Sequence, residues 1–305
     1  MARYIGKRLI ASAITIFFVI TITFFLMMSI PGDPFVSEKM PNAEIRAAMM
    51  AKYGLDKPLF QQYLTYLGNF LRGDFGVSYM KVGLTVNRVI AEGFPYSLFI
   101  GVYASVLVVF AGISAGVICA LRQNKLIDRI FMALSTLGAT IPSFVLATGF
   151  LFLFSKTLGW VPPFGVERMS GYVGPILVIG SFSLAFITRL TRTSLLEVMQ
   201  QDYIRTARSK GISEFRVVWH HALRNALLPV ITYVGPMVAS IVTGSFVIEK
   251  VFGIPGIGNL FTNSIVNRDY PLIMGITVFF AVLLVIAVLI VDIVYMFVDP
   301  RIKFK

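Results

Sequence analysis

The chain has 305 residues, of which 57% are hydrophobic and only 14% are charged, and it carries a formal net charge of +12. Because an ordinary soluble domain is about 25% charged, this composition excludes a water-soluble globular domain and predicts a protein of the lipid bilayer. The single cysteine, Cys119, excludes a disulfide framework, a CxxC redox pair and a cysteine zinc cluster.

Six uncharged segments are long enough to cross a bilayer, because a helix needs about 20 residues to span roughly 30 Å of hydrocarbon. They run from Leu9 to Gly32, Gly93 to Leu121, Ile130 to Ser155, Met169 to Thr188, Asn225 to Ile248 and Tyr270 to Val291. The first is too long for the apolar core of a secretory signal peptide and lacks an Ala-x-Ala cleavage site, so we interpret it as a span. We expect an all-α, polytopic membrane protein with six transmembrane helices.

Positive charge predicts the orientation of these spans. Lys and Arg gather before the first span, between the second and third, between the fourth and fifth, and after the sixth. Short cytoplasmic loops carry such an excess, so both the N- and C-termini are expected in the cytoplasm. Most of the net charge of +12 then reflects topology, and no nucleic-acid partner is expected.

Two segments outside the spans are too long to be simple connectors, because most loops have about 4 to 6 residues. The outer one, residues 33–95, contains a stretch from Leu59 to Leu71 with the apolar spacing of an amphipathic helix. The inner one, residues 189–225, lies between the fourth and fifth spans. We divide the chain into residues 1–32 with the first span, the extracytoplasmic segment 33–95, and a core of residues 96–305 that includes the inner segment.

The inner segment has the pattern of two helices separated by a glycine. From Phe215 onward, apolar residues recur at helical spacing. They are Val218, Trp219, Ala222, Leu223 and Ala226. Upstream, a weaker helical rhythm stops at Gly211, which can adopt the left-handed conformation of a helix end, and Ser213 is expected to cap the next helix. We interpret the segment as a lever that converts force from a cytoplasmic partner into relative motion of the fourth and fifth spans.

Two other interpretations of this basic segment exist on pattern alone. A basic amphipathic helix pair can lie on anionic membrane lipid, and the pattern does not separate this from the lever. A helix-turn-helix that reads DNA is disfavoured, because its second helix would need exposed base-reading residues. Here that helix is apolar on one face and runs into a span.

Short motifs along the chain resemble one family of transporters. Thr206 to Gly211, followed by His221-Ala222-Leu223, resembles the EAA loop of ABC importer permeases, with Arg205 and Thr206 in place of its Glu and first Ala. Eight motifs in order resemble the first of the two permease subunits of oligopeptide, dipeptide and nickel importers. They are Pro31-Gly32-Asp33-Pro34, Gly73-Asp74-Phe75-Gly76-Val77-Ser78, Asp202-Tyr203-Ile204-Arg205-Thr206-Ala207, His221-Ala222-Leu223-Arg224-Asn225-Ala226-Leu227, Gly244-Ser245-Phe246-Val247-Ile248-Glu249, Gly253-Ile254-Pro255-Gly256-Ile257-Gly258, Asn267-Arg268-Asp269-Tyr270-Pro271 and Asp299-Pro300-Arg301.

The resemblance implies an ABC importer type I permease of the bacterial cytoplasmic membrane that moves short peptides by alternating access, with nickel or another small solute as the alternative cargo. It implies a heterodimer with a homologous permease, two ABC ATPase subunits that use ATP and Mg, an extracytoplasmic peptide-binding protein, and surrounding membrane lipid. It also implies a set of ATPase-coupling residues: Arg205, Thr206, Ala207, Arg208, Lys210, Gly211, Ser213, Glu214 and Phe215. No substrate residue is assigned.

Catalysis and cofactor binding are not expected of this chain. It has no Gly-x-x-x-x-Gly-Lys-Ser/Thr phosphate-binding loop, so ATP hydrolysis is expected in the partner subunits. An ion-driven secondary transporter, the rival class, would need ionisable residues near mid-membrane, whereas only Asp292 lies inside a span, near its cytoplasmic end. The adjacent His220 and His221 point about 100° apart on a helix, so no metal site is expected there.

Glycine and proline mark irregular backbone in the membrane. Pro142 in the third span and Pro236 in the fifth are expected to kink their helices, and Gly112 and Gly116 form a face suited to close helix packing. Between the fifth and sixth spans, the motif Gly253-Ile254-Pro255-Gly256-Ile257-Gly258 is not expected to form a regular helix, and we predict that it makes an outer turn or a shallow re-entrant gate. The residues of this predicted gate are Gly253, Pro255, Gly256 and Gly258.

Overall fold

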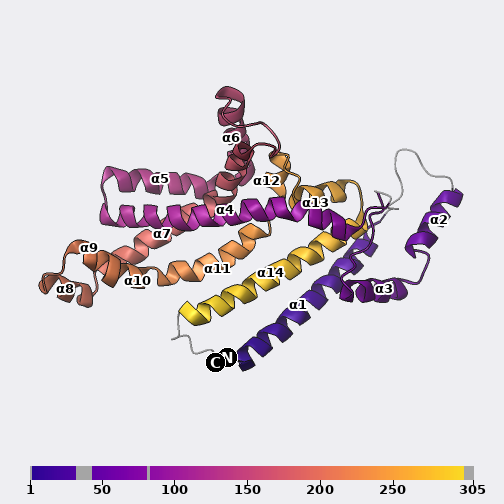
Figure 1. Cartoon of the computed structure of the whole chain (residues 1–305), viewed down its shortest axis with the longest axis horizontal. Helices are drawn as coiled ribbons and strands as arrows, with labels where there is room; N and C mark the ends of the chain where they lie inside the picture. Colours follow the sequence, from indigo (N-terminus) through magenta and orange to yellow (C-terminus); the bar gives the residue numbers. More distant parts are fainter. Residues whose placement is uncertain (1, 32–42, 81–82, 299–305) are drawn as a thin grey trace. The chain divides into compact units, whose positions relative to one another are not determined.

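The computed structural model describes residues 2–31, 43–80 and 83–298, and the described residues form helices joined by turns, with one isolated antiparallel bridge between Val77 and Thr85 (Figure 1). The motif that begins at Pro31 therefore lies almost wholly outside the described residues, and the motif at 299–301 lies wholly outside them. The helices group into two compact units, each of which is described separately.

The first unit comprises Met1–Tyr96, Pro255–Leu289 and Lys303–Lys305. Its helices are α1 (Ala2–Ser29), α2 (Ala43–Tyr53), α3 (Leu59–Leu71), the start of α4 (Val86–Leu121), α13 (Ile257–Val266) and most of α14 (Tyr270–Val298). Helix α3 has the bounds that its amphipathic spacing predicts, and Tyr63 on its apolar face packs with Phe24 of α1. A second apolar cluster joins the starts of α4 and α13 to α14 through Val86, Ile257 and Ile276.

The second unit comprises Ser97–Ile254 and Ile290–Ile302. Besides most of α4, its elements are α5 (Leu126–Thr140), α6 (Ser143–Phe150), a π-helix η1 (Leu151–Thr157), a 3-10 helix η2 (Met169–Tyr172), α7 (Val173–Met199), α8 (Asp202–Ser209), α9 (Glu214–Arg216), a π-helix η3 (Val217–Ala222), α10 (Leu223–Ala226), α11 (Leu228–Val242) and α12 (Phe246–Val251). The short helices α8 and α9 lie at one end of this unit (Figure 1). The two units are defined by backbone contacts and not by position in the membrane. The division of the chain at residues 32 and 95, which is based on predicted topology, therefore stays a prediction.

Four of the described helices are long and apolar enough to cross a membrane: Gly6–Ser29, Val86–Leu121, Met169–Met199 and Tyr270–Val291. Two further candidates are bent pairs, and counting each pair as one span gives the six that the sequence predicts. The all-α, multi-span architecture is therefore confirmed. The third and fifth predicted spans, however, are each made of two helices joined at a bend.

The third predicted span is broken at Pro142. Helices α5 and α6–η1 meet at 110° instead of forming one kinked helix from Ile130 to Ser155. Proline disfavours helical backbone in the residue before it, and Ile141 accordingly adopts an extended conformation with φ −77° and ψ 127°. Proline also has no N–H for a bond to the preceding turn, so α5 ends here and α6 begins anew.

The fifth predicted span also differs from expectation. Its 52° bend lies between Ala226 and Leu228, whereas Pro236, the expected cause of a kink, lies inside the continuous helix α11. The span ends at Val242 instead of Ile248, because Gly244 follows with φ +86° and Ser245 caps the separate helix α12 by accepting a bond from the Ile248 N–H.

Helices α4 and α7 pack closely through the two glycines that the sequence singles out. A Cβ atom at Gly112 would lie 2.8 Å from a methyl carbon of Ile187, and one at Gly116 would lie 2.5 Å from the Cβ of Thr191. Real Cβ atoms do not approach this closely, so the spacing of these helices requires residues without side chains. The predicted role of the Gly-x-x-x-Gly face in helix packing is confirmed.

Candidate functional site

The inner segment is a helix, a left-handed glycine and a second helical stretch, as its sequence predicts. Helix α8 ends at Ser209, and Gly211 follows with φ +73°, a conformation that glycine adopts without a steric penalty. Ser213 stands at the N-cap position of α9, but its side chain accepts no hydrogen bond from the helix, so the capping bond expected of it is not formed.

An apolar cluster fixes this segment to the ends of α4 and α7. Ile204 of α8 and Val217 of η3 are fully buried, and Leu195 of α7 is buried beside them. The complete cluster of buried residues is Val117, Ala120, Leu195, Ile204, Ala207, Val217, Ala222, Leu223 and Ala226. Because packed side chains transmit displacement between rigid helices, a push on α8 or η3 would reach both membrane helices.

The second helical stretch contains a π-helix at its centre, Val217–Ala222, which changes the face that the sequence predicts to be buried. Trp219 is 50% exposed, although the regular helical spacing assigns it to the apolar face, and Val217 takes a buried place instead. In a π-helix, bonds join residues five apart, so Val217 and Ala222 come to the same face. The other four predicted residues of this face, Val218, Ala222, Leu223 and Ala226, are buried as expected.

The surface that this register leaves open carries aromatic rings among basic residues. Phe215 is 72% exposed, and its ring centroid lies 5.9 Å from that of Trp219. Arg205, Lys210 and Arg216 are exposed on the same segment. Exposed aromatic and arginine side chains are typical anchors of protein–protein interfaces, because they bring large contact area and directed hydrogen bonds.

A bidentate ion pair closes the turn around Gly211. The Arg208 guanidinium donates to both Glu214 carboxylate oxygens, with Nε–Oε1 at 2.7 Å and a second N–O distance of 3.3 Å. Arg205 forms a weaker pair with Asp202 at 3.6 Å. Of the nine predicted coupling residues, Ala207 is buried in the apolar cluster, whereas Arg205, Thr206, Arg208, Lys210, Gly211, Ser213, Glu214 and Phe215 are exposed.

A buried ion pair near this segment was not predicted from the sequence. Asp128 of α5 is 2% exposed and accepts two bonds from the Arg192 guanidinium of α7, at 2.7 and 2.8 Å. It also accepts a bond from the backbone N–H of Asn124, which has φ +63°. The sequence signals only an acid and an arginine beside apolar segments, and their pairing depends on helix packing.

The predicted outer gate is a turn between two short helices. Gly253 ends α12 with φ +63°, and Gly256 is the N-cap of α13, its carbonyl accepting a bond from the Leu260 N–H. Pro255 lies in the connection, whereas Gly258 lies inside α13 and is buried. The prediction that residues 253–258 form no regular helix holds for residues 253–256 but is wrong at Ile257 and Gly258, which begin α13, and gating stays a proposal. The sequence also did not single out Glu249 of α12, which is 1% exposed.

Two motifs that are far apart in the sequence meet in the first unit. Asp269 is 2% exposed and accepts hydrogen bonds from the Ser78 hydroxyl and from the Tyr79 N–H, the latter at 3.0 Å. Burial and the nearby Asp269 carboxylate raise the pKa of Tyr79 above its usual range, so its hydroxyl stays neutral. The motif at 73–78 therefore folds onto the residue directly before α14.

Asp292 and the two adjacent histidines form no ion or metal site among the residues that the structure describes. The backbone of Asp292 lies in α14, but its side chain lies outside the described residues. His220 is exposed and His221 half-buried in η3. Among the residues that the structure describes, no three His, Cys, Asp or Glu side chains are arranged to hold a metal ion.

Comparison with known proteins gives a family for the whole chain. Residues 112–304 match the family described as binding-protein-dependent transport system inner membrane component, and residues 1–100 match the N-terminal region of such membrane components. The chain is 48% identical over 303 residues to the dipeptide transport system permease protein DppB of Bacillus subtilis, covering 99% of this chain and 98% of that protein. It is 44% identical to the oligopeptide transport system permease protein OppB of Haemophilus influenzae, with full coverage of both chains.

The fold has a counterpart among solved structures. A chain of the MetNI methionine ABC transporter in an inward-facing crystal form superposes with a TM-score of 0.55 at 19% identity, covering 69% of this chain and 96% of that one. This likeness establishes the permease fold independently of the sequence matches. Taken with the apolar spans and the family matches over both parts of the sequence, the chain belongs to the binding-protein-dependent transport system inner membrane components, as a multi-pass protein of the bacterial cytoplasmic membrane.

Proposed function

We propose that this chain is one permease subunit of an ATP-driven importer of short peptides. The observation that carries the proposal is full-length similarity, at 40% identity or more, to permeases of dipeptide and oligopeptide transport systems. The chain forms one half of the translocation path, and a homologous permease forms the other. A separate extracytoplasmic peptide-binding protein delivers the cargo.

The inner segment is the proposed coupling site for two ATPase subunits that use ATP and Mg. Its apolar side is packed on α4 and α7 through Ile204, Val217 and Leu195, while Phe215 and Trp219 remain exposed. The exposed rings provide contact area for a groove on an ATPase, and the packed side carries its movement to the membrane helices. The Arg208–Glu214 pair keeps the intervening turn in one geometry.

The turn at residues 253–256 is the proposed outer gate. It joins the short helices α12 and α13, and the positive φ of Gly253 lets the backbone reverse at that point. A turn that depends on a single glycine dihedral can change direction without unfolding either helix. Alternating access then combines force received at the inner segment with rearrangement of this turn.

Thiol crosslinking tests the coupling site. In a complex whose permease carries Cys119→Ala, Phe215→Cys should be joined to an ATPase subunit by a short crosslinker, with a yield that changes when ATP binds. Trp160→Cys is the matched control, because Trp160 is also an exposed aromatic residue of the second unit, at 67% exposure, but lies outside the inner segment. Equal capture from both positions, or capture of lipid alone at residue 215, would contradict the coupling role.

Other cargo and another energy source receive no support from the described residues. The two relatives named above are permeases of dipeptide and oligopeptide transport systems, and the described side chains include no group of three His, Cys, Asp or Glu that could hold a metal ion. Membership of an ABC importer family favours ATP over an ion gradient.

A further inference from the structure

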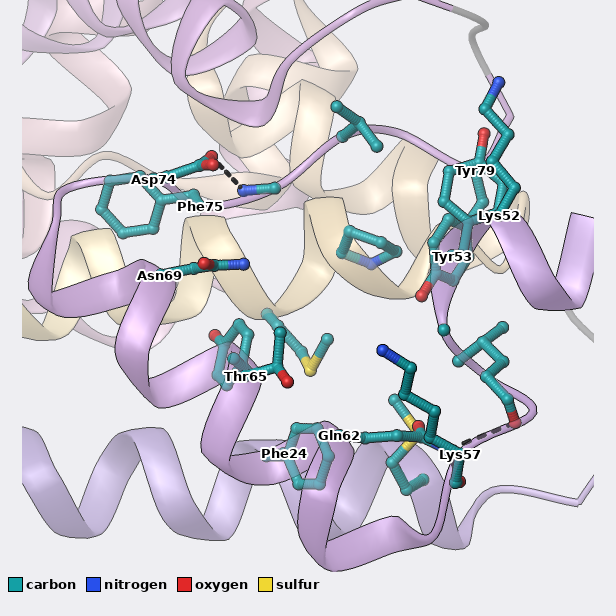
Figure 2. A pocket seen from close by; sticks show the side chains of 18 residues that line it. Phe24, Lys52, Tyr53, Lys57, Gln62, Thr65, Asn69, Asp74, Phe75 and Tyr79 are labelled. Atoms are coloured by element: carbon teal, nitrogen blue, oxygen red, sulfur yellow. Dashed lines mark hydrogen bonds between the residues drawn. The ribbon is translucent and has the colours of Figure 1, made fainter.

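A cavity lined by both polar and apolar side chains lies in the first unit, and no residue of the inner segment or the outer turn lines it. It has a volume of about 300 Å³, at the lower end of the range for small-molecule sites. Figure 2 shows side chains from α2, α3 and the 74–79 segment around it, with Phe24 of α1 on one wall. Pro271 and Met274 of α14 complete the apolar part of the lining.

Charges of both signs line this cavity, from Lys52, Lys57 and Asp74. Lys57 extends its ammonium into the cavity, and Asp74 lies on the opposite side of the view in Figure 2. Among the described residues, no carboxylate forms an ion pair with Lys57. One oxygen of Asp74 accepts a bond from the Gly76 N–H at 2.8 Å, which fixes the direction of the carboxylate.

Two further polar atoms of the lining are buried, and no described protein group bonds to them. Gln62 donates both amide hydrogens, to Leu55 O at 3.2 Å and to Lys57 O at 2.8 Å. If the amide nitrogen and oxygen of Gln62 were interchanged, the oxygen would face two carbonyl oxygens, which is unfavourable. Oε1 is therefore the atom that remains as a buried acceptor without a hydrogen bond. The Tyr66 hydroxyl is the second such atom, and burial raises its pKa above the usual range, so it stays a neutral donor.

Aromatic contacts support two walls of the cavity. The Tyr66 ring stacks on Phe24 with centroids 5.6 Å apart, and the rings of Tyr53 and Tyr79 lie 4.6 Å apart on the far wall. Asn69 and Thr65 add an amide and a hydroxyl from the same face of α3, one turn apart. Such a lining offers apolar walls for a side chain and fixed polar atoms for the charged ends of a ligand.

We infer that this cavity binds a small zwitterion, whose anionic group lies at Lys57 and whose ammonium lies toward Asp74. This is the chemistry of a short peptide or amino acid with free termini, and also of a phosphatidylethanolamine head group. The peptide source rests on the proposed function, whereas the site itself does not. On the predicted topology the cavity faces the extracytoplasmic side.

Photolabelling of the complete importer in nanodiscs, without ATP or binding protein, tests the inference. The probe is alanyl-photoleucine, and labelled positions are mapped by mass spectrometry with unlabelled Ala-Leu as competitor. Labelling within residues 52–79 should be saturable, and a dipeptide with both termini blocked should not compete. Lys57→Gln and Asp74→Asn should each weaken labelling about tenfold, the size expected for loss of a charge-assisted hydrogen bond. Asn keeps the oxygen that bonds Gly76, so the turn is preserved.

Lys52→Gln is the matched control. Lys52 also lines the cavity, but its ammonium lies over the Tyr53 ring, 5.6 Å from the ring centroid, and in Figure 2 it extends away from Lys57 and Asp74. Its labelling should stay within twofold of the original chain. Labelling that does not saturate, or that is unchanged in both Lys57→Gln and Asp74→Asn, would overturn the inference.

Lipid composition separates the two sources of the zwitterion. In discs of phosphatidylcholine and phosphatidylglycerol, dipeptide labelling should be retained. If a photoreactive phosphatidylethanolamine labels the same residues with the same Lys57 dependence and excludes the dipeptide, the site is a lipid site. ATP-driven dipeptide uptake is measured in parallel: normal uptake without any cavity labelling refutes the site alone, and absence of uptake refutes the proposed peptide cargo alone.

Discussion

Gly211 ends α8 in a left-handed conformation, with φ +73° and no atom within 4 Å of the position a Cβ would occupy. The restriction at this residue is therefore one of backbone conformation and not of space. A β-branched side chain in this conformation costs roughly 1–2 kcal/mol. Gly211→Val should change the geometry of the turn, leave assembly intact, and lower peptide uptake while ATP hydrolysis continues.

The control for Gly211 is Gly211→Asn, because asparagine tolerates the left-handed conformation. Uptake and ATPase activity of both variants are measured in proteoliposomes with the complete complex. The Asn variant should stay close to the original protein. Normal ATP-driven uptake by the Val variant would show that the turn geometry does not transmit force.

The Asp128–Arg192 pair is the second residue-scale feature with a testable consequence. The Asp128 side chain is 3% exposed and that of Arg192 is 20% exposed, so removing one partner leaves a largely buried charge without its counter-charge. Such a loss costs about 3–5 kcal/mol. Arg192→Met should therefore lower the thermal unfolding midpoint of the detergent-solubilised permease strongly.

Two controls accompany Arg192→Met: a double variant that removes both charges, and a variant that breaks an exposed ion pair. Asp128→Leu combined with Arg192→Met removes both charges and should recover much of the stability lost in the single variant. Arg208→Gln, which breaks a pair with side chains 40% and 64% exposed, should change the midpoint little, because exposed pairs contribute about 0–1 kcal/mol. Equal losses at the two pairs would contradict the structural role assigned to Asp128.

At the scale of elements, the close contact of α4 with α7 depends on Gly116. Its ideal Cβ would lie 2.5 Å from the Thr191 Cβ and 2.7 Å from the Thr188 carbonyl oxygen. Overpacking of a tight contact costs about 1–3 kcal/mol. Gly116→Leu should lower the unfolding midpoint and reduce the yield of assembled complex, because the two helices must move apart.

Gly149→Leu is the matched control for this helix contact. Gly149 lies in α6, and nothing lies within 4 Å of its ideal Cβ. The same substitution there should leave the midpoint nearly unchanged and the complex assembled. An equal loss at both glycines would mean that general helix propensity, and not the α4–α7 contact, sets the effect.

At the scale of the whole molecule, the energy source distinguishes an ABC permease from an ion-driven carrier. Proteoliposomes that contain the complete complex should accumulate labelled peptide when ATP is enclosed with the ATPase subunits. An imposed proton gradient without ATP should give no accumulation, because Asp292 is the one acid that the sequence places at the predicted spans, and the spans contain no histidine to pass a proton on. Uptake driven by the gradient alone would contradict the proposed function.

Local sequence patterns predict those structural features that depend on only a few neighbouring residues. The bounds of α3, the left-handed Gly211 and the turn that begins at Gly253 follow from amphipathic spacing and from glycine itself. The family resemblance also came from local motifs. These features depend on backbone preferences and on hydrophobic periodicity, which are properties of the chain before it packs.

Features that depend on partners distant in the sequence could not be predicted. The π-helix at Val217–Ala222 exposes Trp219, and no spacing rule signals a change from regular helical bonding. The 110° break at Pro142 was expected only as a kink, because its angle is set by what packs around α5 and α6. The binding partner of Arg192 was likewise unknown until helix α7 was placed beside α5.

The sequence by itself determined that this is an all-α membrane protein of a transport family, because composition and the lengths of apolar runs reflect the solvent in which a chain must fold. Only the tertiary structure decided which side of the inner segment is buried, that Asp269 holds the 73–79 segment, and that Lys57, Gln62 and Asp74 surround one cavity. The physical reason is that burial, ion pairing and cavity shape arise from contacts between helices, and such contacts have no period in the sequence.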